Sequence, residues 1–171
     1  VMGDWYRNLD GLVSLQPGQE RLLTPLPLVH MNALATSAMG MILTGGCVIQ
    51  LDRFHASTWW KSVLESKATV IHYLGVLPAI LLNLPESPDD RNHAVRFGFG
   101  AGINAKHHAP FEQRFGIALL EAWSMTEVGG AAAVIANHEP RHVGSSCFGK
   151  AEAFMNWRLV DDSGADVPQG T

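Results

Sequence analysis

Apolar runs alternate with amphipathic stretches along most of the chain, and this alternation is the main structural signal in the sequence. Several of the runs are apolar almost throughout, which is typical of strands that are covered on both faces. The stretches between them are bounded by helix signals, with Ser57 at one start and Gly45 and Gly116 at two stops. We therefore predict strands over residues 21–28, 47–51, 69–74, 95–100 and 117–123, and helices over residues 33–43, 57–68, 78–84 and 106–115.

Strands that alternate with helices predict the fold class α/β, with a parallel sheet flanked by helices. After Gly130 the pattern changes to short strands over 131–135 and 157–160 and a turn over 161–164. We expect three parts: a leading helical or loop segment (1–20), an α/β sheet subdomain (21–138), and the truncated start of a small β-rich subdomain (139–171). Because the chain begins with Val1 and ends in a turn-like DVPQGT, we expect a piece of a longer protein.

Composition narrows the classes of function. The 171 residues are 47% hydrophobic and only 16% charged, with a formal net charge of −4. Such a chain is not intrinsically disordered, and without a basic stripe we expect no nucleic-acid partner. Cys47 and Cys147 stand far apart, so we exclude a disulfide scaffold and expect a cytoplasmic protein. Residues 22–51 carry no charge, but prolines, glycines and polar residues interrupt them, so we expect no membrane span.

The candidate chemistry follows three predicted strands, at 29–32, 100–104 and 123–130, because ligands of parallel sheets bind at the carboxyl ends of strands. We expect the second and third segments to be neighbours in space, because adjacent parallel strands end at the same edge. Thr126 beside Glu127 could hold a phosphate oxygen and its Mg²⁺, and Trp123 offers a flat face to a base. The alternatives are that Thr126 caps a following helix, and that the glycines form a plain turn.

Four segments, in this order, resemble the adenylate-forming enzymes: acyl- and aryl-CoA ligases, luciferases and adenylation domains of peptide synthetases. PLPLVHMNA (25–33) is similar to the family's proline–leucine–aromatic–histidine segment, GFGAGINA (98–105) to its adenine-side glycine loop, and WSMTE (123–127) to its Tyr-Gly-x-Thr-Glu signature. Residues 144–164 resemble the start of the next subdomain. Within the family the chain looks most like carnitine/crotonobetaine-CoA ligases, partly through residues 139–162.

The resemblance implies an enzyme that uses ATP and Mg²⁺ to activate a carboxylic acid as acyl-AMP and then transfers the acyl group to CoA. Thr126 would bind a phosphate oxygen, Glu127 would ligate Mg²⁺, and Trp123 would stack on adenine. Glu121 would lie near the adenine amino group. The implied nucleotide-binding residues are Gly100, Ala101, Gly102, Glu121, Ala122, Trp123, Ser124, Met125 and Thr126, and the implied catalytic residues are Thr126, Glu127 and His30.

The resemblance also implies an acyl pocket, in which His30 lies near the path of the CoA thiol. Trp123-Ser124 departs from the family's Tyr-Gly pair, and the chain lacks the phosphate loop, the ribose-binding aspartate and the C-terminal lysine. We therefore expect this piece alone to be inactive, and its partners to include the other parts of the same enzyme beside the acid, ATP and CoA. A homodimer is a further expectation. The implied pocket residues are His30, His72, Tyr73, Val76, Leu77 and Met125.

Other interpretations stay open at this point. The chain could be a truncated pseudo-enzyme or another non-catalytic module that binds a nucleotide or an acyl group, or a relative that loads a carrier-protein thiol. His107 and His108 are adjacent, and Pro140 interrupts the spacing of His138 and His142, so neither pair is a good metal site. His30 could instead be a buried core histidine.

Overall fold

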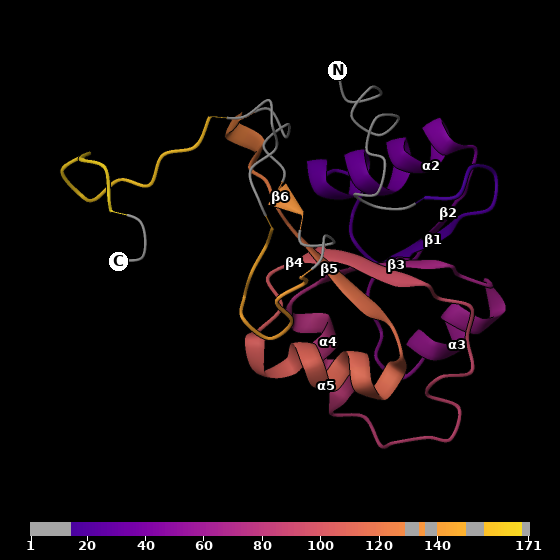
Figure 1. Ribbon diagram of the computed structural model, residues 1–171. Helices are drawn as coiled ribbons and strands as arrows, with labels where there is room; N and C mark the ends of the chain where they lie inside the picture. Colours follow the sequence, from indigo (N-terminus) through magenta and orange to yellow (C-terminus); the bar gives the residue numbers. More distant parts are fainter. Residues whose placement is uncertain (1–14, 129–133, 136–139, 150–155, 169–171) are drawn as a thin grey trace.

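The apolar runs form a sheet and the amphipathic stretches form helices on both of its faces, which confirms the predicted fold class (Figure 1). The computed structural model describes residues 15–128, 134–135, 140–149 and 156–168. The strand order is β2-β1-β3-β4-β5-β6, in which β1 to β5 are parallel and β6 is antiparallel to β5. The strands are β1 (Arg21–Thr24), β2 (Cys47–Gln50), β3 (Val70–Leu74), β4 (Phe97–Ala101), β5 (Ala118–Trp123) and β6 (Val134–Ile135).

The helices divide between the two faces of the sheet, as Figure 1 shows. The π-helix η1 (Asn32–Met39) and the α-helix α2 (Gly40–Thr44) cover one face. The other face is covered by α3 (Trp59–Glu65), α4 (Val76–Leu82) and α5 (Ala105–Phe115). A single 3-10 turn, η2 (Thr126–Val128), follows β5.

Two apolar cores result, because successive side chains of a strand point to opposite faces. The larger core lies on the α3, α4 and α5 face and includes Leu23, Trp59, Ile71, Tyr73, Leu77, Phe111, Phe115 and Leu119. The smaller core lies on the η1 and α2 face and contains Leu22, Met41, Val70, Phe97, Phe99 and Leu120. Burial on both faces explains why the strands are apolar almost throughout.

Several predicted boundaries differ from the structure. Strand β1 ends at Thr24, because Pro25 has no N–H and the Thr24 hydroxyl accepts the N–H of Leu26 at 3.1 Å. The expectation that Ser57 caps a helix is wrong: α3 begins at Trp59, and the preceding Thr58 makes no side-chain capping bond. The predicted helix stops are confirmed, because Gly45 and Gly116 both adopt the left-handed conformation just after α2 and α5.

The predicted helix over 33–43 forms in two registers, since η1 has the wider π turn and α2 the ordinary α turn. Pro78 lies in the first turn of α4, two residues after its start, where a missing N–H is tolerated. Of the predicted strand 131–135, residues 134–135 form β6 and the others lie outside the described residues.

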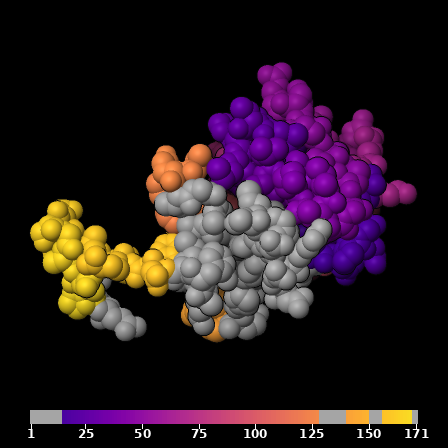
Figure 2. All heavy atoms as spheres, turned by 90° about the horizontal axis from the view of Figure 1, so that it is seen from above, coloured from indigo at the N-terminus to yellow at the C-terminus, as the bar shows by residue number. Residues whose placement is uncertain are grey.

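The last described segment, 156–168, extends away from the sheet on the β6 side (Figures 1 and 2). It contains the predicted turn, in which the Asp161 carboxylate accepts the N–H groups of Ser163 and Ala165. Of the predicted strand 157–160, only Val160 pairs, in an isolated antiparallel bridge with Asp166. No helix in the described part of the chain is both long enough and apolar enough to cross a membrane.

Candidate functional site

Parallel pairing brings two of the candidate segments to one edge of the sheet. Strands β4 and β5 pair in register from Phe97 opposite Ala118 to Gly100 opposite Glu121. The glycine loop after β4 and the segment that begins at Trp123 therefore leave the sheet side by side, which confirms that they are neighbours. This edge is also the carboxyl end of the other parallel strands, where ligands of such sheets bind.

Close backbone packing shapes the glycine loop. The N–H of Gly75 donates to the carbonyl of Ala101 at 2.9 Å, and a Cβ on Gly75 would lie 1.7 Å from the carbonyl oxygen of Gly102. Gly102 itself has a φ of 77°, a conformation that glycine adopts without strain. The loop ends at Asn104, whose side chain accepts the N–H of Lys106 and so caps α5. Its path is therefore set by backbone contacts that side chains would block.

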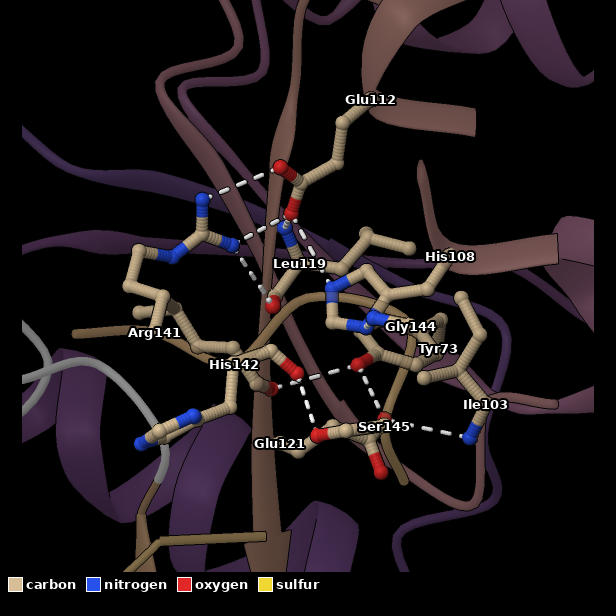
Figure 3. Close-up of polar contacts among 11 residues, drawn as sticks. Tyr73, Ile103, His108, Glu112, Leu119, Glu121, Arg141, His142, Gly144 and Ser145 are labelled. Carbon is tan, nitrogen blue, oxygen red and sulfur yellow. Dashed lines mark hydrogen bonds and ion pairs between the residues drawn. The ribbon is translucent and has the colours of Figure 1, made fainter. Parts of the chain in front are cut away.

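Glu121 lies beneath this loop as a buried carboxylate with three donors. Its Oε2 accepts the N–H of Gly102 at 2.9 Å, and its Oε1 accepts the N–H of Ile103 at 3.1 Å. The hydroxyl of Tyr73 donates to Oε1 at 2.6 Å, as Figure 3 shows. Burial, and then the neighbouring Glu121 charge, raise the pKa of Tyr73 well above its usual value, so this hydroxyl stays a donor. Both carboxylate oxygens are thus used inside the protein.

The segment after β5 presents a different chemistry, because its polar side chains are exposed. Trp123 is half-buried and meets the ring of Trp157 edge-on, with ring centroids 5.2 Å apart. Thr126 and Glu127 lie in η2, both exposed, and neither bonds to any described residue. Thr126 is the first residue of η2, and residues 129–133 lie outside the described residues, so the alternative in which Thr126 caps a following helix stays a prediction. An aromatic face, a hydroxyl and a carboxylate therefore follow one another from the end of β5 into η2.

His30 lies at the same edge of the sheet, in the loop after β1. It is exposed, and its N–H donates to the carbonyl of Pro27 at 3.1 Å. Its own carbonyl accepts the N–H of Leu34 and so helps to start η1. The alternative reading of His30 as a core histidine is therefore wrong.

The remaining acyl-side residues do not gather on one surface. His72 and Tyr73 follow each other in β3 and point to opposite faces, so His72 contacts Phe99 while Tyr73 packs in the larger core. The ring of His72 is fully buried, and its Nδ1 lies 2.7 Å from the Ser37 hydroxyl. That burial lowers the pKa of His72 to about 3. Of the other three, Leu77 is buried, whereas Val76 and Met125 are exposed.

A second polar cluster beside the site has no counterpart in the sequence analysis. Glu112 on α5 accepts two hydrogen bonds from the guanidinium of Arg141, one from Nε2 of His108 and one from the N–H of Leu119 (Figure 3). Burial alone would raise the pKa of Glu112, but hydrogen bonds from His108 and Arg141 lower it to about 2. Arg141 also donates to the Leu119 carbonyl at 3.2 Å. The cluster therefore joins Arg141 to α5 and to Leu119 in β5.

The local sequence carries only part of the signal for this cluster. His108 and Glu112 are four residues apart on a helix, a spacing that places them side by side. Arg141 comes from 29 residues further along the chain, and no local pattern marks it. As for metal sites, His138 lies outside the described residues, and within the described ranges no three His, Cys, Asp or Glu side chains could hold an ion together.

Comparisons with known proteins point to one family of enzymes. A family model described as "AMP-binding enzyme" matches residues 3–171. The medium/long-chain-fatty-acid–CoA ligase FadD6 of Mycobacterium tuberculosis is 35% identical over 130 residues, which cover 75% of this chain and 22% of that protein. The sulfoacetate–CoA ligase of Cupriavidus necator is 36% identical over 116 residues, which cover 66% of this chain and 22% of the relative.

The solved structures agree on the fold. A benzoate CoA ligase from Burkholderia xenovorans LB400 has a TM-score of 0.80 and 19% sequence identity, and the match covers 99% of this chain and 35% of that chain. At this identity the likeness supports the shared fold alone. The chain spans 22% of the length of each of the two CoA ligases named first.

Proposed function

Because the chain belongs to the AMP-binding enzyme family, we propose that it is part of an ATP-dependent acid–thiol ligase. Such an enzyme joins a carboxylic acid to the α-phosphate of ATP, which releases pyrophosphate, and then transfers the acyl group from acyl-AMP to the thiol of CoA. The observation that carries the proposal is the pairing of β4 with β5, through which the glycine loop and the Trp123–Glu127 segment end side by side. Two of the relatives above are CoA ligases by name.

The nucleotide lies, in this proposal, across the carboxyl ends of β4 and β5. Gly100 and Ala101 at the end of β4, and Gly102 just after it, present their backbone to one side of the adenine. The half-buried Trp123 presents its indole to the other side. The exposed hydroxyl of Thr126 donates to a phosphate oxygen. Catalysis then rests on position and charge rather than on a protein nucleophile. The residues that flank these groups are Glu121, Ala122, Ser124 and Met125.

Glu127 is the proposed ligand of Mg²⁺. Its carboxylate is exposed and engages no described residue, so it is free to coordinate. One protein carboxylate together with phosphate oxygens is the usual environment of Mg²⁺ at a nucleotide. When bound, the ion would neutralise phosphate charge. Glu127 itself places a carboxylate next to the Thr126 hydroxyl, so that cation and phosphate are oriented by adjacent residues.

The acyl group and CoA approach, in this proposal, from the side of His30. The exposed imidazole of His30 at the carboxyl edge suits a position near the thiol. The other proposed contacts differ in exposure: Met125 and Val76 are exposed, whereas His72, Tyr73 and Leu77 are buried and would form the walls behind. We propose an acid of the carnitine and crotonobetaine class, on the sequence resemblance alone, which rests partly on residues 139–162.

The wider organisation is also a proposal. The boundaries 1–20, 21–138 and 139–171, a cytoplasmic location and a homodimer follow from the sequence pattern or the family resemblance. The parts of the site that this chain lacks would come from the rest of the same enzyme, which fits the small share of the relatives that it spans.

The test is ATP–pyrophosphate exchange by the intact enzyme that carries this sequence, with a panel of carboxylic acids that includes carnitine and crotonobetaine. We expect exchange that depends on the acid, and formation of a CoA thioester when CoA is added. The 171-residue chain alone should show no exchange, because it lacks the phosphate loop and the lysine. Intact enzyme that binds ATP without exchange for any acid would be a binding module, and acyl transfer only to a carrier protein would replace CoA as the acceptor.

A further inference from the structure

Glu121 and Tyr73 are joined to the glycine loop by a set of contacts that the proposed reaction does not use. The carboxylate is only 4% exposed, and it accepts the N–H groups of two consecutive loop residues, Gly102 and Ile103. From the other side Tyr73, 2% exposed, donates its hydroxyl to the same carboxylate (Figure 3). We propose that Glu121, supported by Tyr73, is a positioning residue that holds the glycine loop in the shape that receives the nucleotide. This inference rests on the proposed function.

The chemistry of the carboxylate suits this role. An ionised carboxylate only accepts hydrogen bonds, and here every neighbouring polar group is a donor: two backbone N–H groups and a phenol. A glutamine of the same shape has one acceptor oxygen and one NH₂ group. In Glu121→Gln that NH₂ group would face an N–H or O–H donor, so at least one hydrogen bond would be lost. The loop therefore depends on the charge, and not only on the size, of this side chain.

The loop has little freedom to take another path once Glu121 holds it. Gly75 packs against the Gly102 carbonyl so closely that a Cβ there would lie 1.7 Å from its oxygen. The N–H of Gly75 also holds the carbonyl of Ala101. The loop is thus held by Gly75 from one strand end and by Glu121 from another, and the removal of either contact should release it.

Position separates this role from direct contact with the base. The side chain of Glu121 is buried under the loop on the α5 side of the sheet, where Tyr73 belongs to the larger core. Both of its oxygens already hold donors from the protein. Glu121 therefore acts on the nucleotide through Gly102 and Ile103, and its effect should not depend on the amino group of adenine.

The chain contains a matched control at the opposite edge of the sheet. Glu20 is 2% exposed, and it too accepts a backbone N–H, from Gln16 at 2.7 Å, and a hydroxyl, from Thr69 at 2.5 Å. It also pairs with Arg96. Because Glu20 precedes β1, it lies at the amino edge, far in the strand direction from the glycine loop. Glu20→Gln should thus destabilise the fold without a specific effect on the nucleotide.

The experiment compares Glu121→Gln, the milder Tyr73→Phe and the control Glu20→Gln in the intact enzyme. The nucleotides are ATP and purine riboside triphosphate, which lacks the 6-amino group. We expect Glu121→Gln to raise the KM for both nucleotides by the same factor, about 10- to 100-fold, and Tyr73→Phe by about 3- to 10-fold. Glu121→Gln should not change the KM for the acid, and Glu20→Gln should change no KM.

Three results would overturn the positioning role. A penalty in Glu121→Gln for ATP alone would assign Glu121 to the adenine amino group. An equal rise of KM in Glu20→Gln would make the effect one of general destabilisation. The third is amide hydrogen exchange at Gly102 and Ile103 that is no faster in Glu121→Gln than in wild type. Amide hydrogen exchange needs no turnover, so it tests the contact between Glu121 and the loop even in an enzyme that forms no acyl-AMP. Failure of the wild-type enzyme to form acyl-AMP would refute the proposed function instead.

Discussion

Acid should destabilise this fold through His72, because its ring is fully buried in the neutral form. Its Nδ1 lies 2.7 Å from the Ser37 hydroxyl, and its Nε2 is buried without a hydrogen-bond partner among the described residues. Burial lowers the pKa of the ring from 6.5 to about 3. In the unfolded chain the ring regains water, so between these two pH values only the unfolded state takes up the proton. Stability therefore falls as the pH falls through this window.

The size of the effect follows from the width of the window. Each pH unit within it removes about 1.4 kcal/mol from the free energy of unfolding. The first two units below the unfolded value thus remove roughly 3 kcal/mol, a large part of the roughly 5–15 kcal/mol that stabilises a typical domain. His93 adds a loss of the same sign, because burial also lowers its pKa.

The perturbation is His72→Asn, whose side-chain amide keeps a partner for Ser37 but has no proton to gain in this range. Urea unfolding, followed by tryptophan fluorescence, gives the free energy of unfolding at several pH values between 3 and 6.5. We expect the variant to be less stable near neutral pH and to show a shallower slope against pH. Equal slopes in wild type and His72→Asn would refute the reasoning.

Three further predictions test other parts of the molecule. Despite burial, hydrogen bonds from His108 and Arg141 hold the pKa of Glu112 at about 2, so wild type should be more stable than Glu112→Gln above pH 4.5. This difference in stability should disappear as the pH falls toward 2, where the unfolding curves of wild type and variant should converge. Gly75→Ala should lower the melting temperature far more than Gly102→Ala, because a Cβ on Gly75 would lie 1.7 Å from a carbonyl oxygen. A Cβ on Gly102 meets nothing within 4 Å and costs only about 1–2 kcal/mol of left-handed strain. Similar melting temperatures of the two variants would contradict this packing. In single-turnover assays of the intact enzyme, Glu127→Gln should slow adenylation about 10²- to 10³-fold and slow thiolation of pre-formed acyl-AMP much less. Equal slowing of both steps would show that Glu127 is not the metal ligand.

The sheet could be predicted from the sequence because burial on both faces leaves a direct trace in the apolar runs. The ends of the elements could not, since they depend on individual hydrogen bonds. Strand β1 stops where the Thr24 hydroxyl takes the N–H of Leu26, and α3 starts without the cap that Ser57 suggests. The π turn of η1 could not be predicted either, because a wider turn depends on the register of backbone hydrogen bonds. The small apolar residues of 33–43 do not indicate that register.

For the candidate site, the neighbourhood of the two loops was predictable because adjacent parallel strands end at one edge. That His72 and Tyr73 point to opposite faces of the sheet was also predictable, since consecutive residues of a strand face opposite ways. The Arg141–Glu112 contact was not, because it joins residues 29 positions apart whose partners are chosen by tertiary packing. Local chemistry thus identifies candidate groups, and the topology decides which of them meet.

Glu20 and Glu121 illustrate this division between chemistry and topology. Each is a buried carboxylate that accepts a backbone N–H and a hydroxyl, and each joins neighbouring strands of the same sheet. Glu20 also pairs with Arg96, but apart from that ion pair the two environments are similar, and side-chain chemistry alone would assign them one role. They differ in where they lie along a strand: Glu20 precedes β1, whereas Glu121 approaches the end of β5. In a parallel sheet only the end of a strand, where Glu121 lies, adjoins the loops that bind ligands. The direction of the strands therefore means that Glu20 stabilises the fold, whereas Glu121 also positions the proposed site.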